Sequence, residues 1–137
     1  MKNKRFVLDV NTLISAFLLH ENSTAARAWY KAQKSGNIVM SEDTFNEFCD
    51  VFVRPKFDRY LSLTKRLVII EDIKAVVDIV SITSTISACR DPKDNKFLEL
   101  AVDAGASCII TGDKDLLILH PFNNIPVLTA ADFLANF

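Results

Sequence analysis

The sequence predicts an α/β fold, in which helices cover both faces of a central parallel β-sheet. Short apolar runs of strand type alternate along the chain with helical patterns, and this alternation favours parallel strands joined by helical crossovers. The apolar runs are continuous, as expected for strands that are buried on both faces. The chain has 137 residues, of which 50% are hydrophobic, and this is enough for the core of one domain.

The predicted strands are the apolar runs at residues 5–9, 37–41, 78–83, 107–111 and 125–129. Two of these runs lead directly into acidic residues. Asp9 closes the first run, and Asp113 follows the fourth run after Thr111 and a glycine. Functional groups in open parallel sheets gather beyond the carboxyl ends of the strands. We therefore expect both carboxylates at one edge of the sheet, with the first strand central and beside the fourth.

Helical patterns separate these strands. The segment 23–36 begins with a Ser-Thr cap and ends at Gly36, a typical C-terminal stop. The segment 91–105 has Asp91 as its cap, Pro92 at the first helical position and a glycine at its end. The other predicted helices are 41–53, a stretch over 57–77 that is one long helix or two shorter ones, and 130–137.

Several side chains are expected to be buried. The helix 41–53 places phenylalanines on one stripe, and the stretch 57–77 has a set of aliphatic candidates. Trp29 and Tyr30 lie in a predicted helix and are expected to pack against the protein rather than to stack on bases, whereas His20 and His120 are expected in surface or loop positions. The candidates for the core are Phe45, Phe48, Phe52, Leu61, Leu67, Ile70, Ile73 and Val77.

Charge and cysteine content limit the class of protein. The net charge is −1, so nucleic acid could be bound only through local basic patches. Three cysteines without a C-x-x-C pair indicate buried thiols in a reducing cytosol. Asp9 and Asn11 interrupt the apolar N-terminal stretch, which argues against a signal peptide, and no run approaches the length of a membrane span. We therefore expect a cytoplasmic protein without membrane contact.

One group of basic residues could serve as such a local patch. It lies between residues 54 and 66, around the start of the stretch 57–77. A solvated face is the expected role, and contact with a phosphate backbone is the lesser alternative. The residues are Arg54, Lys56, Arg59, Lys65 and Arg66.

Two further acids can reach the sheet edge that holds Asp9 and Asp113. Glu47 lies about one turn into the helix 41–53, and Asp94 lies in the first turn of the helix 91–105. Clustered carboxylates repel one another unless a cation neutralises them, and hard ions such as magnesium and manganese prefer oxygen ligands. A metal ion held in this way can activate water for attack on phosphorus. The four acids, with no histidine near them, therefore predict metal-assisted phosphodiester hydrolysis.

Each acid also has a structural interpretation. Asp94 can favour the helix dipole, Asp113 can cap a short helix, and Glu47 alone would be a solvated helix residue. Asp9 has the weakest structural alternative, because a carboxylate at the end of a buried strand is costly without a partner. Asp115 is expected to cap a helix or to support the last ligand rather than to bind metal directly.

The motifs around these acids resemble those of the PIN domain family. Their order and spacing match the family across nearly the whole chain, and the closest similarity is to bacterial and archaeal members that are toxin components of toxin-antitoxin systems. The resemblance implies a single PIN-like domain over residues 1–137, with a three-layer α/β/α sandwich. The motifs are VLDVNTLISA, SEDTFNEF, RDPKDNKFLELAVDAGA and CIITGDKDLL.

The resemblance also implies an activity and its partners. It implies a ribonuclease that depends on magnesium or manganese and hydrolyses single-stranded RNA, acts as a homodimer and is neutralised by a small antitoxin protein. Asn11 and Thr111 match small polar positions beside the site, and Asp115 matches an acid often found next to the last ligand. The family's metal-binding and catalytic acids carry over as Asp9, Glu47, Asp94 and Asp113.

Two alternatives stay open at this point. The residues DVNT at 9–12 also resemble the D-x-D-x-T start of haloacid-dehalogenase-type phosphatases, and GDKD resembles their late acidic motif. Asn11 stands where that family has a general-acid aspartate, and no central lysine motif is clear, so the nuclease is preferred. The third hypothesis is a non-catalytic interaction module with a vestigial acidic pocket.

Overall fold

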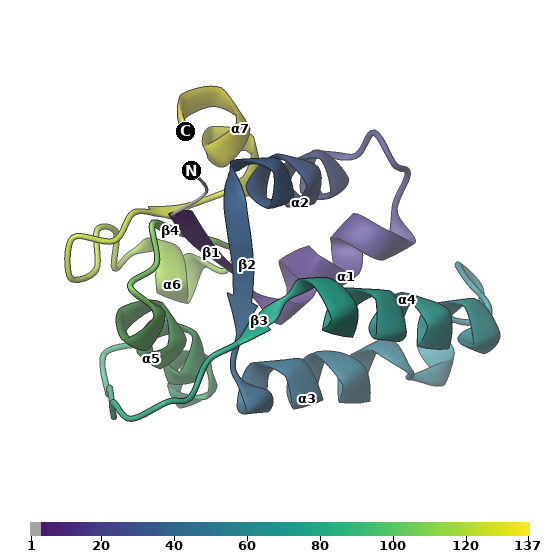
Figure 1. Cartoon of the computed structure of the whole chain (residues 1–137), viewed down its shortest axis with the longest axis horizontal. Coiled ribbons are helices and arrows are strands. Elements are labelled where there is room, and N and C mark those ends of the chain that lie inside the picture. The colour runs from purple at the N-terminus through teal and green to yellow at the C-terminus, as the bar shows by residue number, and fades with distance from the viewer. Residues whose placement is uncertain (1–3) are drawn as a thin grey trace.

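The computed structural model describes residues 4–137, and in this part of the chain a five-stranded parallel sheet lies between two layers of helices (Figure 1). The strand order is β3-β2-β1-β4-β5. β1 is central and pairs with both β2 and β4, so the predicted fold class and the predicted place of the first strand are confirmed. The strands are β1 (Lys4–Leu8), β2 (Gly36–Met40), β3 (Asp78–Ile79), β4 (Cys108–Ile110) and β5 (Val127–Leu128).

The helices form the outer layers of this α/β/α arrangement. They are α1 (Val10–Leu18), α2 (Thr24–Ser35), α3 (Glu42–Phe52), α4 (Leu63–Val76), α5 (Asn95–Ala104), α6 (Lys114–Leu117) and α7 (Ala130–Asn136), with 3₁₀ turns η1 (Pro55–Phe57) and η2 (Pro92–Asp94). α1 and α2 lie on one side of the sheet, and α5 and α6 lie on the other (Figure 1). Within residues 4–137, none of these helices is long and apolar enough to cross a membrane.

Helix α1 was not predicted, because Asp9 was interpreted as the end of a strand, although Val10, Leu13 and Ile14 form a buried stripe at helical spacing. Its N-terminus is capped by Asp9, whose Oδ1 accepts the N–H of Thr12 at 2.8 Å. Asp9 is therefore the single residue between β1 and α1. Its carboxylate has the capping role that favours aspartate at a helix start, in addition to any chemistry at the sheet edge.

Strand β3 is shorter than the predicted run over 78–83, because the chain leaves the sheet after Val80, whose N–H still donates to the carbonyl of Met40 at 2.8 Å, and then follows α5. Side chains of α5 accept the backbone N–H groups that a longer strand would have paired. Asp103 accepts from Thr83 and Ser84, Glu99 accepts from Ile86, and Asn95 accepts from Ala88 and Cys89, at 2.6 to 3.2 Å. Three turns of one helix thus hold an irregular segment in place.

The two glycines that were predicted to end helices do so for different reasons. Gly105 has φ of 61°, the left-handed conformation that the prediction assumed. Gly36 instead has φ of 179°, which is extended backbone open to any residue. A Cβ atom at Gly36 would lie 2.1 Å from the carbonyl oxygen of Lys4, so glycine is required there because β1 and β2 approach closely.

The buried side chains mostly agree with the prediction. Phe48 and Phe52 are buried and stacked at 4.9 Å between ring centroids, Trp29 packs in the core, and Ile70, Ile73 and Val77 are buried. Phe45 and Leu61 are half-buried. All three cysteines are free thiols, with Cys89 and Cys108 buried as predicted and Cys49 half-buried.

Three burial predictions are wrong. Leu67 is 48% exposed and Tyr30 is 57% exposed, whereas Arg66, which was predicted on a solvated face, is fully buried. The Arg66 guanidinium donates to the carbonyl oxygens of Phe52 at 2.7 Å and Leu61 at 2.9 Å, and it pairs with Asp58. Arg66 shares the buried face of α4 with Ile70 and Ile73, whereas the adjacent Leu67 lies on the exposed face.

Candidate active site

The four predicted acids line one cavity at the carboxyl ends of the central strands. The cavity has a volume of about 230 Å³. Asp9 follows β1, Asp113 follows β4, Glu47 comes from α3 and Asp94 closes η2. Asn11, Arg54 and Lys56 also line it. The topology thus brings together side chains from four separate parts of the chain, because parallel strands present their carboxyl ends at the same edge.

Thr111 links the first and the last acid of this cavity. Its hydroxyl donates to Oδ2 of Asp9 and accepts the N–H of Asp113 at 2.9 Å. Asp9 is also held by the N–H of Thr12, so both oxygens of this buried carboxylate have donors. These contacts follow from the pairing of β1 with β4, in which the N–H of Asp9 donates to the carbonyl of Ile110 at 3.2 Å.

Asp94 has the most strongly shifted pKa of the four acids. Among residues 4–137, its Oδ2 is the one buried side-chain polar atom without a hydrogen-bond donor. The pKa of Asp94 is raised to about 7, first by burial, then by a hydrogen-bonding contact with the Asp113 carboxyl and by its charge, and last by the charges of Asp91 and Asp9. Two carboxylates placed this way need a shared proton or a cation between them.

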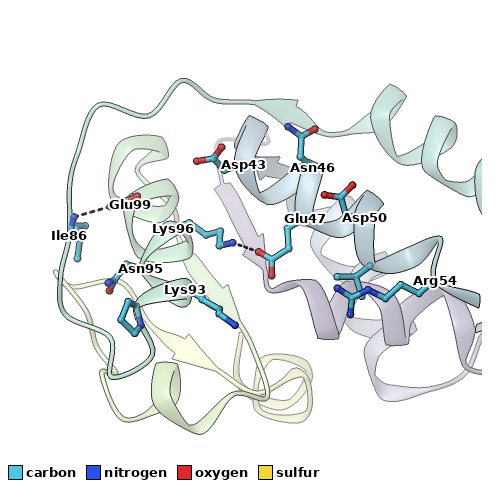
Figure 2. Close-up of a pocket in the computed structure, with 12 residues that line it drawn as sticks. Asp43, Asn46, Glu47, Asp50, Arg54, Ile86, Lys93, Asn95, Lys96 and Glu99 are labelled. Carbon is cyan, nitrogen blue, oxygen red and sulfur yellow. Dashed lines mark hydrogen bonds and ion pairs between the residues drawn. The ribbon is translucent and has the colours of Figure 1, made fainter. Parts of the chain in front are cut away.

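Glu47 stands apart from this coupled group. Its carboxylate forms an ion pair with the ammonium of Lys96 on α5 (Figure 2). Glu47 also lines a second space, a groove of about 620 Å³ between α3 and α5. Its charge is not among those that raise the pKa of Asp94. Glu47 therefore faces the acidic cavity on one side and the groove on the other.

The structural roles that were considered for the aspartates are present as well. Asp91 accepts the N–H of Lys93 at 3.1 Å and caps η2, as predicted. Asp113 accepts the N–H of Asp115 at 2.8 Å and begins α6, so it caps a helix while it lines the cavity. Asp115 is not among the residues that line the cavity. Capping and chemistry are thus compatible for Asp113 in the same way as for Asp9.

Lys96 is the residue of this region that the sequence analysis missed as a functional candidate. It lies 49 positions from Glu47, and no local pattern joins the two. Its only sequence signal is its place inside the RDPKDNKF motif, two residues after Asp94. The histidines are exposed as predicted, and neither lines the cavity.

The donor set fits a hard divalent cation in its chemistry, although the ligands are not fully assembled. Carboxylate oxygens are the ligands that magnesium and manganese prefer, and the donorless Oδ2 of Asp94 points to a missing positive partner. Within residues 4–137, no group of three histidine, cysteine, aspartate or glutamate side chains stands in metal-binding geometry. Binding of an ion by all four acids therefore requires side chains to turn, and Glu47 must leave Lys96.

The chain is similar in sequence and in fold to known proteins. Residues 5–115 match the family model described as PIN domain. The chain is 30% identical over 144 residues to the uncharacterized protein MJ1680 of Methanocaldococcus jannaschii, a match that covers 97% of this chain and 91% of that protein. The crystal structure of PAE2754 from Pyrobaculum aerophilum has the same fold, with a TM-score of 0.62 and 12% identity over 96% of this chain and 88% of the other.

Proposed function

Because this chain belongs to the PIN domain family, whose members are typically nucleases that use divalent metals, we propose that it hydrolyses phosphodiester bonds in single-stranded RNA with magnesium or manganese. The observation that carries this proposal is the buried, donorless Oδ2 of Asp94 beside Asp113, in a cavity shared with Asp9 and Glu47. An acid that resists ionisation in this setting gains most from a cation.

Each residue has a distinct role in the proposed reaction. Asp9, Asp94 and Asp113 hold the ion with their carboxylates, and Glu47 completes the set. The ion, when bound, polarises the phosphate and lowers the pKa of a water molecule. Arg54 and Lys56 line the cavity wall and offset the negative charge of an incoming phosphate. Thr111 keeps the Asp9 carboxylate oriented and fixes the Asp113 backbone.

We further propose that the protein is the toxin of a toxin-antitoxin pair, acts in the cytoplasm as a homodimer and is neutralised by a small antitoxin. The support is the similarity of its motifs to those of toxin members, together with exposed apolar side chains that a partner would cover. Several of these lie on and before α4, namely Tyr60, Leu63, Leu67 and Val68. Light scattering of the purified chain should give the mass of a dimer, and Leu67→Glu should shift it towards the monomer.

The activity is tested with a fluorescent single-stranded RNA and the purified protein. We expect cleavage with manganese or magnesium and none with a chelator, and cleavage should return when the metal is restored. A phosphatase would instead hydrolyse small phosphomonoesters and leave RNA uncut, and an interaction module would do neither with any metal. Either of these results contradicts the proposal.

A further inference from the structure

Glu47 is shared between the acidic cavity and the groove between α3 and α5. The groove has two other acids on its α3 wall, Asp43 and Asp50. The Lys96 ammonium nevertheless pairs with Glu47, the one groove acid that also lines the cavity (Figure 2). The cation that Lys96 supplies is therefore placed at the carboxylate that the proposed metal ion needs.

The pair is built so that it can be exchanged. The side chains of Lys96 and Glu47 are 27% and 34% exposed, so solvent reaches both partners. A lysine ammonium is a point charge on a flexible stem, and a partly exposed pair of this kind contributes little net stability. A divalent ion carries twice the charge and is bound by several oxygens at once, so it competes favourably for the same carboxylate.

We infer that Lys96 is the internal counter-ion of Glu47 in the metal-free site and that a divalent cation displaces it from Glu47 when the site assembles. Lys96 is then a positioning residue that holds Glu47 on the groove side and lowers the affinity of the site for metal. This inference rests on the proposed function, because it assumes that the four acids bind the ion together.

The structure explains why such a counter-ion is useful. Asp9 is satisfied by Thr12 and Thr111, whereas Asp94 and Asp113 share an unmet need for positive charge. A fourth free carboxylate at the same edge would add repulsion to the metal-free fold. With Glu47 neutralised by Lys96, three acids remain for the incoming ion, and the fourth joins only when the ion is present.

A matched control for Lys96 lies in the same groove. Lys93 also lines it, yet it forms no ion pair with any residue between 4 and 137. Replacing either lysine by methionine removes one positive charge from the groove and keeps a long side chain. Both variants lose one positive charge beside the same groove, and a Glu47→Gln background separates the part of any difference that acts through the Glu47 contact.

The test measures manganese binding to the RNA-free protein by calorimetry. We expect Lys96→Met to bind manganese about three- to five-fold more tightly than Lys93→Met, the range set by a partly exposed ion pair. Lys96→Gln should behave as Lys96→Met does. In a Glu47→Gln background, the difference between the two lysine variants should vanish, because the coupling partner is absent.

The outcomes separate this inference from the proposed function. If the wild-type protein binds manganese and Lys96→Met binds it no more tightly than Lys93→Met, the inference is wrong and the metal site stands. A difference between the lysine variants that persists with Glu47→Gln also overturns the inference, since it would not act through Glu47. If neither the wild type nor Lys96→Met binds manganese or magnesium, the proposed function and the inference both fail.

Discussion

The raised pKa of Asp94 makes the stability of the metal-free protein depend on pH in a way that can be tested. The pKa of its carboxyl is about 7 in the folded chain, against 3.8 for an unperturbed aspartate, so the folded state favours the protonated form. The contribution of Asp94 to the free energy of unfolding of the metal-free protein then falls as pH rises from about 4 to about 7, because the unfolded chain gives up this proton first. Deprotonation of Asp94 destabilises the fold unless a cation is bound.

Asp94→Asn should therefore stabilise the metal-free protein in alkaline solution. We expect its free energy of unfolding to exceed that of the wild type by about 1 to 2 kcal/mol near pH 8, after allowance for solvent screening, and to differ little near pH 3.5, where Asp94 is mostly protonated in both the folded and the unfolded chain. Urea denaturation in the presence of a chelator measures this difference at both pH values.

Asp103→Asn is the control, because it removes the same charge from a site of opposite character. Hydrogen bonds from the Ser84 hydroxyl and from the backbone N–H groups of Ser84 and Thr83 lower the pKa of Asp103. Its carboxylate stabilises the fold above the usual aspartate pKa, so this substitution should destabilise the protein near pH 8. Equal effects of the two substitutions would show that net charge, and not the Asp94 site, is responsible.

Thr111 is expected to matter for both stability and activity. Thr111→Val keeps the shape but leaves the N–H of Asp113 and Oδ2 of Asp9 without their partner, which should cost about 1 to 3 kcal/mol in unfolding free energy. Loss of this support for two of the proposed metal ligands should lower RNA cleavage by about 10- to 100-fold. Thr111→Ser keeps the hydroxyl and should retain most activity; cleavage equal in the two variants would refute the linking role.

The candidate acids could be predicted from sequence, but their electrostatic partners could not. Asp9 and Asp113 stand out because charged residues directly follow buried strands. Lys96 and Arg66 looked like ordinary surface cations, because Glu47 lies far from Lys96 along the chain and Arg66 binds backbone carbonyls at the end of α3 and in the segment between α3 and α4. Such contacts depend on tertiary placement, which no local spacing encodes.

The secondary-structure predictions succeeded for helices with clear capping residues and stop signals, and they failed where a residue or an apolar run had two interpretations. α2 and α5 have clear caps and stops, and the structure has them within a few residues of the predicted bounds. α1 was not predicted although Asn11, Thr12 and Ser15 give it a polar face, because its cap, Asp9, was interpreted only as the end of a strand. β3 was overextended because its apolar run continues, although the pairing moves from the sheet to α5.

Hydrogen exchange can measure separately how each side chain of α5 protects the backbone amides that it accepts in the segment 83–89. Asp103→Ala should raise the hydrogen-exchange rates of the Thr83 and Ser84 amides by about ten-fold, because their acceptor is lost. The amide of Cys89, which Asn95 accepts at 2.8 Å, should keep its protection. A uniform rise over the whole segment would mean that it opens as one unit and that the individual acceptors do not act separately.

For the whole molecule, the alternation of strands and helices was sufficient to predict the layers and the sheet edge at which the four acids line one cavity. The order β3-β2-β1-β4-β5 brings Asp9 and Asp113 onto adjacent central strands, and crossovers on either side carry Glu47 and Asp94 to the same edge. The orientation of each carboxylate was beyond the sequence, because it depends on Thr111, on Lys96 and on burial at the cavity. The fold could therefore be predicted from the alternation of strands and helices, whereas the orientation and charge state of the carboxylates depend on tertiary packing.

The most direct test of the central claim compares single and double amide variants in metal-dependent RNA cleavage. Asp94→Asn and Asp113→Asn should each lower the cleavage rate by about 100-fold or more, and the double variant should lose little beyond either one, because the acids act as one unit. Asp91→Asn should cleave as the wild type does, since asparagine is an equally good cap. RNA cleavage that survives the combined Asp94→Asn and Asp113→Asn substitutions would contradict the assignment of this cavity as the active site.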